Sequence, residues 1–399
     1  MKVIQDTNEC LDWNPNECFL KDHIVVKYKY KTKIENKEAA HLLCREQSTS
    51  TWNRLHQESK NIRKRRAAKL LSLDEKYFSI AYPVTNIHNQ LSDLLVTIIG
   101  NGSFLNTKIF SELYIVDISF PNSYLENFNG PKYGTDILGW FSPNIPLLIG
   151  VQKPSIGLSA KTHIKRALDG LLGGCDIVKE DEQLRPYDND CNILDRIKYI
   201  SRELPKVIRK NKRHMMYVFN ICSDLHLEEY INMIEEIQIC DPYPIFGIMV
   251  SLSQGLPSIR KICDKTSLPV LLHPSGIGLY TRGSFGISPE MMILLMRLAG
   301  NDIIIYPTPF SKISNCSQKE ANNILHMANK AHNKIKKPII SFGCGVNTEV
   351  IEKIHNCFNN EDYSLLVGGA IYGDLNGPYS GSVKFKKKIN MVFNCKKET

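Results

Sequence analysis

Long apolar runs are missing from this sequence, and their absence excludes one class of protein at the outset. No stretch approaches the roughly 20 consecutive apolar residues that a membrane-spanning helix needs, although hydrophobic residues make up 43% of the 399 residues. The first residues, MKVIQDTNECLDWNPNECF, also lack the basic-then-apolar order of a secretory signal. We therefore expect a cytoplasmic protein with no membrane partner.

A CxxC pair is likewise absent, even though the chain has 12 cysteines. Cysteine pairs at that spacing supply most structural zinc ribbons, so a ribbon of this kind is excluded. Several of the cysteines, including Cys175, Cys222 and Cys263, stand inside apolar runs. We expect them to be reduced thiols in the core, as is usual in the cytoplasm.

A nucleic-acid-binding motif is lacking too, although the net charge is +9. The densest basic stretches are KNIRKRRAAK (60–69) and KFKKK (384–388), and neither is interleaved with a series of aromatic residues on which bases stack. Solvated helix faces account for both stretches, and a positive field also suits a small anionic substrate. We expect no nucleic-acid partner and keep binding through 60–69 as a distant alternative.

What the sequence does contain, from about residue 145 onward, is a regular alternation of apolar and amphipathic segments. The apolar runs are nearly continuous, which is typical of strands buried on both faces of a parallel sheet. The amphipathic runs between them have helical spacing. The apolar runs are IPLLIGVQK (145–153), CDIVKED (175–181), MMYVFNIC (215–222), IFGIMVS (245–251), LPVLLHP (268–274), DIIIYPT (302–308), PIISFGCG (338–345) and YSLLVGG (363–369).

Eight strand–helix units in the second part of the chain predict an α/β fold. We expect a C-terminal (β/α)8 TIM barrel over residues 141–399, because this number of units closes a barrel. A doubly wound open sheet is the alternative architecture.

Residues 1–140 have a different pattern. Segments with period-two alternation and segments with helical periodicity follow one another in the order β-α-β-β-α-β. This order is typical of an α+β domain of the ferredoxin-like type. Three of the four strands in this order are placed at 22–34, 77–85 and 112–121, and the two helices at 36–47 and 91–102.

Polar residues and glycines collect where the expected barrel strands end. In this fold the chemistry lies at the carboxyl ends of the strands, whereas residues at the other end serve mainly stability. Glycines after the last two strands occupy the usual phosphate position, where bare backbone N–H groups can approach an anion. We predict one site at this rim. The strand-end residues are Lys153, Lys179, Asp181, Glu182, Asn220, His273, Lys312, Gly343, Gly345, Gly368 and Gly369.

The stretch KEDE (179–182) sets a lysine among acids. In an extended chain Lys179 and Asp181 point to the same side, into the barrel mouth, and Glu182 follows as the strand ends. Two carboxylates there suit Mg2+, but an ammonium at contact distance would repel that ion by several kcal/mol. Two interpretations stay open on spacing alone: a salt bridge without a metal, or a lysine whose charge CO2 has removed as a carbamate.

The same residues resemble a known family. The segment QKPSIGLSAKTHIKRALDGLLGGCDIVKEDEQL (152–184) is similar to the pattern KPKxGLSxK…GGxDxxKxDE of the Rubisco large-subunit superfamily. Further likeness covers nearly the whole chain in the same order. It lies in EQSTSTW (46–52), GNGSF (100–104), HPSGIGLYTRGSFGISPEMMILLMRLAG (273–300) and VGGAIYGDLNGPYSG (367–381).

This resemblance implies an N-terminal α+β domain, a C-terminal barrel, bound Mg2+, and a homodimer whose sites lie between one barrel and the partner's N-terminal domain. Carried over by position, it implies that a carbamylated Lys179 holds Mg2+ together with Asp181 and Glu182. It also implies that Lys153 handles protons and that His273 lies on the substrate side. The remaining catalytic and substrate- or phosphate-binding residues that it implies are Lys312, Asn220, Gly345, Gly368 and Gly369, with Glu46, Thr51 and Asn101 from the partner subunit.

Departures from the carboxylases of this family narrow the function. The second lysine of KPK is Ser155, the arginine that binds the second phosphate is Pro274, and the strand 6 histidine is Ile305. Lys312 falls near the mobile-loop lysine of carboxylases, but the glycine-rich context of that loop is absent. The chain therefore resembles a Rubisco-like protein, from the non-carboxylating branch (form IV).

That branch implies Mg2+-dependent enolisation of a phosphorylated keto-sugar through a metal-bound enediolate, by an enolase, an isomerase or a decarboxylase of methionine salvage or acid-sugar catabolism. The base lysine of the methionine-salvage enolases aligns with about Glu112, so Lys153 is the expected base and Lys132 the reserve. The alternatives are a true ribulose-bisphosphate carboxylase and a non-catalytic Rubisco-like scaffold.

Overall fold

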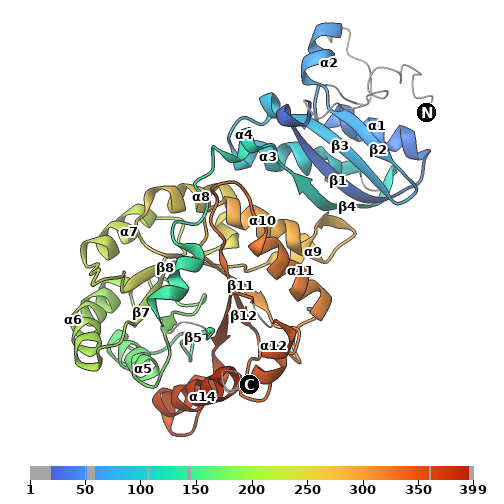
Figure 1. Ribbon diagram of the computed structural model, residues 1–399. Helices are drawn as coiled ribbons and strands as arrows, with labels where there is room; N and C mark the ends of the chain where they lie inside the picture. The colour runs from blue at the N-terminus through green and yellow to red at the C-terminus, as the bar shows by residue number, and fades with distance from the viewer. Residues whose placement is uncertain are drawn as a thin grey trace. The chain divides into compact units, whose positions relative to one another are not determined.

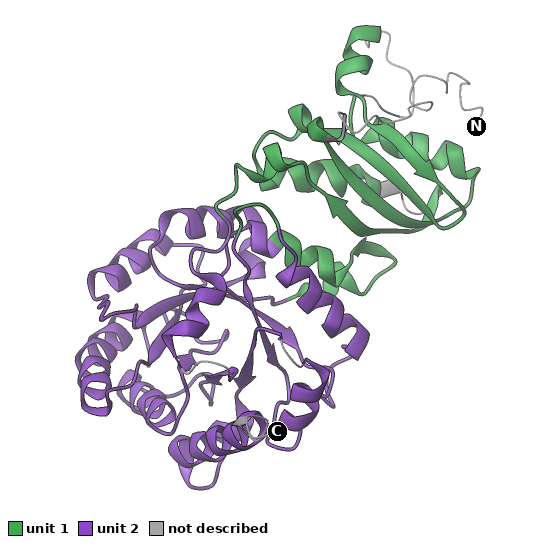
Figure 2. Cartoon of the chain, in the orientation of Figure 1, with its two compact units in different colours: residues 1–129, 276–295, 332–335 green, residues 130–275, 296–331, 336–399 purple. Residues whose placement is uncertain are grey.

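The structure, a computed structural model, describes residues 19–49, 51, 59–105, 108–141, 145–358 and 361–394. The chain divides into two compact units (Figure 2). Unit 1 takes up a segment from the second half of the sequence, so each unit is discontinuous along the chain. Unit 1 comprises Met1–Asn129, Gly276–Leu295 and His332–Ile335, and unit 2 comprises Gly130–Ser275, Met296–Ala331 and Lys336–Thr399.

Unit 2 contains a closed barrel of eight parallel strands, hydrogen-bonded in the order β11-β12-β13-β5-β6-β7-β8-β9. The predicted (β/α)8 barrel is therefore confirmed. Neighbouring strands follow chain order because each is joined to the next by a crossover on the outside of the sheet. The strands are β5 (Leu147–Val151), β6 (Ile177–Lys179), β7 (Met216–Asn220), β8 (Phe246–Ser251), β9 (Val270–His273), β11 (Ile303–Pro307), β12 (Ile339–Gly343) and β13 (Tyr363–Val367).

Helices follow the strands along this part of the chain (Figure 1). Side-chain caps fix where some of them begin: Ser159 accepts a hydrogen bond from the Thr162 amide, and Asn192 accepts one from the Asp195 amide. Such caps are worth about 0.5–2 kcal/mol each. Among the described residues, no helix has both the length and the apolar character required to cross a membrane. The longer helices are α5 (Ala160–Leu172), α6 (Ile193–Asn211), α7 (Leu227–Glu236), α8 (Leu256–Lys265), α10 (Pro289–Leu298), α11 (Gln318–Asn329), α12 (Ile351–Cys357) and α14 (Gly377–Asn394).

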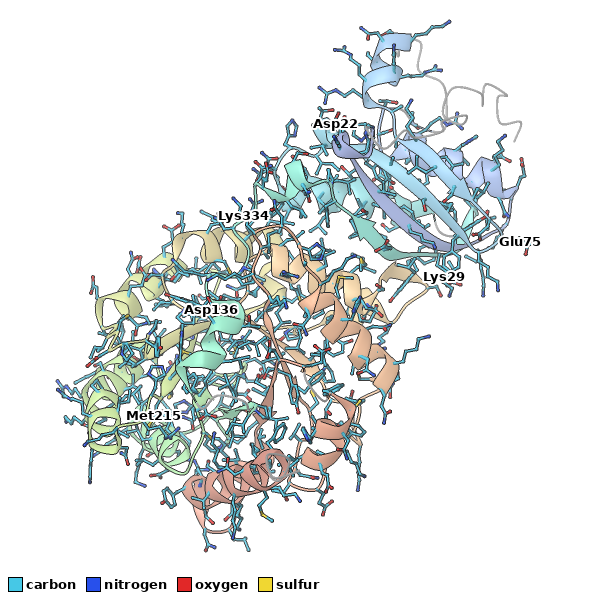
Figure 3. All side chains as sticks on the ribbon, in the orientation of Figure 1. Asp22, Lys29, Glu75, Asp136, Met215 and Lys334 are labelled. Atoms are coloured by element: carbon cyan, nitrogen blue, oxygen red, sulfur yellow. The ribbon has the colours of Figure 1, made fainter. Side chains whose placement is uncertain are left out.

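The amino-terminal end of the barrel is covered by the short helix η4 (Gly134–Trp140). Ile137 of this helix is fully buried in the apolar cluster that fills the barrel, and Figure 3 shows Asp136 on η4 in front of the strands. Asp302, just before β11, accepts a hydrogen bond of 2.7 Å from the amide of Tyr133 and so anchors the helix. Because this end is plugged, the opposite end of the barrel is left for chemistry.

Unit 1 contains a five-stranded sheet in the order β10-β4-β1-β3-β2, and Figure 3 labels Lys29 on β1. The first four strands, with α1 and α3, follow the β-α-β-β-α-β order, so the predicted ferredoxin-like plan is confirmed. The elements are β1 (His23–Thr32), α1 (Asn36–Glu46), α2 (Lys60–Arg66), β2 (Lys69–Leu73), β3 (Tyr77–Pro83), α3 (Leu91–Ile98), β4 (Phe110–Ser119) and β10 (Phe285–Ile287).

The positions of two strands of this sheet, β2 and β10, were not predicted from the sequence. The basic stretch 60–69 forms the solvated helix α2, none of whose residues is buried, and then runs into the short strand β2. The three residues of β10 lie between β9 and α10 in the sequence but pair in parallel with β4, where Phe285 faces Leu113. A three-residue strand whose partner is so distant in sequence leaves no periodicity to read.

Candidate active site

Side chains at the end of β6 alternate between two environments, as expected of an extended chain. Lys179 is fully buried inside the barrel, where its amine donates to the Sδ of Met249 at 3.2 Å. Glu180 points the other way and binds Arg196 of α6. Asp181 returns to the barrel mouth, where it contacts Lys153. Lys179 and Asp181 therefore belong to the site at the barrel mouth, whereas Glu180 belongs to the ion pair with Arg196.

The Lys179 amine lies in surroundings that disfavour its charge. Burial lowers the pKa of Lys179, and the carboxylates of Glu182 and Asp181 offset part of this effect. The nearest carboxylate atom is Oε2 of Glu182, 3.8 Å from Nζ. A buried amine with a lowered pKa has a larger neutral fraction, and the neutral amine is the form that reacts with CO2.

Asp181 and Lys153 form the closest ion pair at the mouth, with 2.6 Å between Oδ2 and Nζ. The Asp181 side chain is only 1% exposed, whereas that of Lys153 is 41% exposed and also donates to Oγ of Ser155 at 3.0 Å. Burial favours a raised pKa for Asp181, but the Lys153 ammonium and the Gln183 amide outweigh it and hold the pKa below its usual value. Asp181 is therefore an anion at neutral pH.

Glu182 lies between Lys179 and His273. Its Oε2 is 3.5 Å from Nε2 of His273, whose Nδ1 is 2.8 Å from Oγ of Ser275. Burial and the charge of Lys179 lower the pKa of His273 to about 4. The imidazole is therefore neutral at pH 7, and its contact with Glu182 is not an ion pair.

The glycines after β13 present bare backbone beside Lys153. A Cβ placed on Gly369, the first residue of α13 (Gly369–Tyr372), would meet no atom within 4 Å. A Cβ on Gly368 would lie 3.7 Å from Cε of Lys153. At the end of β12, Gly345 has φ +91°, and a Cβ there would come within 3.0 Å of the Ser311 side chain. An anion at this corner could approach the bare backbone of Gly368 and Gly369, with the Lys153 side chain beside Gly368.

Two of the predicted residues are not part of this cluster. Lys312 is exposed in the loop after β11. Asn220 is fully buried at the end of β7, and its amide donates to backbone carbonyls of the segment that follows β6. The Asn220 side chain is therefore occupied within the protein rather than turned toward a substrate.

The residues expected to act from a partner subunit lie in unit 1. Nδ2 of Asn101 donates to Oε1 of Glu46 at 3.0 Å. Both residues line a hollow of about 630 Å³ that also includes Arg66 and His88. Thr51 is partly exposed, and Trp52 of the same motif lies outside the described residues.

The reserve base Lys132 does not lie at the barrel mouth, and Glu112, which aligns with the base lysine of the methionine-salvage enolases, is on β4 of unit 1. Glu112 on β4 accepts a hydrogen bond of 2.5 Å from Lys29, whose ammonium outweighs burial and lowers the pKa of Glu112. Lys132 donates to the carbonyl of Thr266, which precedes β9, so it lies at the amino-terminal end of the barrel. Lys153 is thus the base candidate that shares the mouth with Asp181.

A buried ion pair behind the site was not foreseen from the sequence. Arg196 and Glu180 are both fully buried and bind each other, and the hydroxyl of Tyr217 donates to Glu180 at 2.6 Å. A signal was present, because Arg196 stands in the buried stripe of α6 with Ile200 and Leu204. An arginine on the apolar face of a helix needs a buried acceptor.

Arg166 of α5 is a second such residue. Its Nη2 donates to the carbonyl of Lys153 at 3.0 Å and to the carbonyl of Tyr372 at 3.1 Å. It thus joins the end of β5 to the end of α13. Nothing in its sequence context marks this role.

The donor atoms at the mouth fit a hard cation only with a third oxygen. Among the described residues, no three His, Cys, Asp or Glu side chains are arranged to hold a metal ion. Asp181 and Glu182 offer two carboxylates, and a carbamate on Lys179 would add a third anionic oxygen ligand of the kind that Mg2+ prefers. The chemistry of the set therefore fits Mg2+ and CO2.

Comparisons with known proteins agree with this arrangement. The family "Ribulose bisphosphate carboxylase large chain, catalytic domain" matches residues 131–397, and the corresponding N-terminal-domain family matches residues 12–124. A ribulose bisphosphate carboxylase-like protein of Chlorobaculum tepidum is 24% identical over 395 residues, covering 92% of this chain and 88% of that protein.

Two further proteins are similar over most of their length. A 2,3-diketo-5-methylthiopentyl-1-phosphate enolase of Bacillus cereus is 26% identical over 325 residues, covering 79% of this chain and 75% of the enolase. The crystal structure of octameric ribulose-1,5-bisphosphate carboxylase/oxygenase from Pyrococcus horikoshii superposes with a TM-score of 0.87 at 21% identity. That match covers 98% of this chain and 92% of the other, and it shows a common fold.

Proposed function

Because the chain belongs to the family of ribulose bisphosphate carboxylase large chains, we propose that it is a Mg2+-dependent enzyme that enolises a phosphorylated keto-sugar. One observation carries the proposal: the buried amine of Lys179, whose pKa is lowered, lies beside Asp181 and Glu182 at the barrel mouth. A barrel kept only for its fold gains nothing from acids and a buried lysine at this place.

Three side chains would hold the cofactors. A carbamate on Lys179, together with Asp181 and Glu182, would hold Mg2+. When bound, Mg2+ supplies Lewis-acid stabilisation of the negative charge that develops on the substrate oxygens. As a metal ligand, Asp181 would have to give up its ion pair with Lys153.

Lys153 and His273 would handle protons. Lys153 in its neutral form would remove the proton from the carbon next to the substrate carbonyl, because its side chain lies at the mouth beside Gly368. His273 is neutral at pH 7 and borders Glu182, so it can pass a proton without adding charge to the site.

The substrate's phosphate would bind at the glycines. Gly368 and Gly369 offer backbone without side chains, and Gly345, two residues beyond the end of the neighbouring strand β12, would add a further contact. No ionisable side chain stands at Ser155, Pro274 or Ile305, and Ile305 is buried in the barrel core. This distribution supports a substrate with one phosphate, and the enolase of Bacillus cereus is a relative whose named substrate has one.

The proposal includes a homodimer. Glu46, Thr51 and Asn101 would reach the barrel of the partner subunit, and the Glu46–Asn101 hydrogen bond supports their acting together. The similar protein from Pyrococcus horikoshii is octameric.

The test is exchange of substrate C–H protons with solvent deuterium, measured across ketose 1-phosphates and keto-acid sugar phosphates. We expect exchange with at least one compound, dependent on both Mg2+ and bicarbonate and abolished by Lys179→Ala. Lys132→Ala removes an exposed lysine at the other end of the barrel and should leave exchange unchanged. Absence of exchange with every compound would favour a non-catalytic scaffold, and CO2 fixation onto ribulose bisphosphate would identify a carboxylase.

A further inference from the structure

We propose that Asn220 is a positioning residue. It holds in place residues 181–184, which we call the metal-ligand turn. This inference rests on the proposed function and deepens it, since it concerns how the ligands are presented rather than which residues they are. The inference gives Asn220 a positioning role instead of the substrate contact that the family resemblance implies.

The side-chain amide of Asn220 donates hydrogen bonds to backbone carbonyls of this turn. Nδ2 of Asn220 donates to the backbone oxygens of Asp181 at 3.1 Å, Glu182 at 3.3 Å and Leu184 at 2.8 Å. Its Oδ1 accepts from the amide of Cys222 at 3.0 Å, which fixes the rotation of the side chain. Two of the three carbonyls belong to the proposed ligands themselves.

The backbone of Asn220 holds the same segment from its other side. The amide nitrogen of Asn220 donates to Oε2 of Glu180 at 2.7 Å. Glu180 stands between Lys179 and Asp181, and Arg196 binds its carboxylate from α6. Asn220 therefore binds Asp181 and Glu182 through its side chain and Glu180 through its backbone amide.

An amide is the side chain that this place requires. Asn220, Asp181 and Leu184 are all buried, so the carbonyls of Asp181 and Leu184 have little access to water as a donor. Alanine removes the donor that joins these carbonyls to β7, and aspartate sets a carboxylate against three carbonyl oxygens. The Asp181 oxygen then keeps only the Leu184 amide at 3.1 Å and the Glu182 oxygen only Nη1 of Arg185 at 2.9 Å, and both of these donors belong to the segment after β6. Without the tie to β7, the peptide planes of Asp181 and Glu182 can shift. The directions of their Cα–Cβ bonds, and with them the spacing of the two carboxylates, then change.

The experiment measures ligand presentation without any substrate. Mg2+ binding is titrated calorimetrically in the presence of bicarbonate, and the carbamate is followed by 13C NMR with [13C]bicarbonate, with Lys179→Ala as the blank. The variants are Asn220→Ala and Asn220→Asp, with Asn220→Ser as a milder change that keeps one donor. Circular dichroism and thermal unfolding identify the folded variants.

Asn301→Ala is the matched control. Asn301 is also a fully buried amide of unit 2, and its Nδ2 donates to the carbonyl of Met296 at 2.7 Å. It precedes β11 and so lies at the amino-terminal end of the barrel, away from the ligands. A general loss of stability would affect both asparagine variants, whereas a change in ligand presentation affects only those at Asn220.

We expect Asn220→Ala and Asn220→Asp to weaken Mg2+ binding about 10- to 100-fold, as is common when a partner of a metal ligand is removed, and to reduce the carbamate signal. Asn220→Ser should fall between them and the wild type, and Asn301→Ala should bind Mg2+ as the wild type does. A folded Asn220→Ala protein with wild-type Mg2+ affinity and carbamate would overturn the inference and leave the proposed function standing. A wild-type protein that forms no carbamate and binds no Mg2+ would overturn the proposed function, and the inference with it.

Discussion

Nζ of Lys153 lies 2.6 Å from Oδ2 of Asp181, so the proposed base is paired with a proposed metal ligand. The Asp181 side chain is almost wholly buried and therefore has little access to water as an alternative partner. The ammonium and a divalent cation would compete for the same carboxylate. Metal binding and release of the base would thereby be coupled through Asp181.

Replacing Lys153 tests this coupling. Lys153→Met removes the competing ammonium and should strengthen bicarbonate-dependent Mg2+ binding by about 3- to 10-fold, or about 0.7–1.4 kcal/mol, because the Lys153 side chain is 41% exposed and water screens much of its charge. The same change should lower deuterium exchange about 100-fold or more, since a general base contributes that much. Calorimetry and exchange measure the two effects. Lys165→Met, which removes an exposed lysine from α5, should change neither, and weaker Mg2+ binding by Lys153→Met would contradict the coupling.

Carbamate formation should depend on pH through Lys179. Burial lowers the pKa of this amine from its ordinary 10.5, so its neutral fraction rises as the pH increases and levels off at a lower pH than for a free lysine. Below that pKa, the initial rate of carbamate formation at fixed dissolved CO2 should increase about tenfold per pH unit. Time courses by 13C NMR between pH 6 and 9 provide the measurement. A rate that falls as pH rises would show that another group controls the step.

Arg196 should matter for stability rather than for chemistry. Arg196→Met leaves the buried Glu180 carboxylate without its cation, and the free energy of unfolding should fall by about 3–5 kcal/mol. Arg196→Met combined with Glu180→Gln should recover part of this loss, because the unpaired charge is gone. Urea denaturation measures both. Lys206→Met breaks the exposed pair with Glu203 and should change stability by less than about 0.5 kcal/mol; an equal loss there would argue against burial as the cause.

Gly369 should be important for anion binding but not for folding. A methyl group at this position meets no atom within 4 Å, so Gly369→Ala should change the free energy of unfolding by less than about 0.5 kcal/mol. Because the methyl occupies the space proposed for the phosphate, affinity for inorganic phosphate should fall about tenfold, or 1.4 kcal/mol. Calorimetry and thermal unfolding separate the two effects. In the control Gly381→Ala, the new Cβ would lie 2.3 Å from the carbonyl oxygen of Ile371, so stability should fall while phosphate affinity stays unchanged. Unchanged phosphate affinity in Gly369→Ala would exclude this corner as the phosphate site.

The barrel could be predicted because its signals are local. Each of the eight strands is a short apolar run buried on both faces, and the residue types within a few positions of one another are enough to mark it. The alternation of Lys179, Glu180 and Asp181 follows from the same local geometry, since successive side chains of a strand point to opposite faces.

The pairings between elements could not be predicted in this way. β10 joins the sheet of unit 1 through β4, which lies far away in the sequence. The partner of Glu180 is Arg196 on α6, and the partners of the Asn220 amide are carbonyls after a different strand. Contacts of this kind depend on which elements become neighbours when the barrel closes.

The amino-acid sequence thus decided the periodicities, the strand ends and the chemical types of the groups at the barrel mouth. The tertiary structure decided the charge states and the contacts of those groups. Lys179 is buried beside the thioether of Met249, Asp181 is paired with Lys153, and His273 is neutral. The reason is physical. Residue type and spacing are properties of the chain, whereas pKa values and ion pairs depend on burial and on distances across space, which exist only after folding.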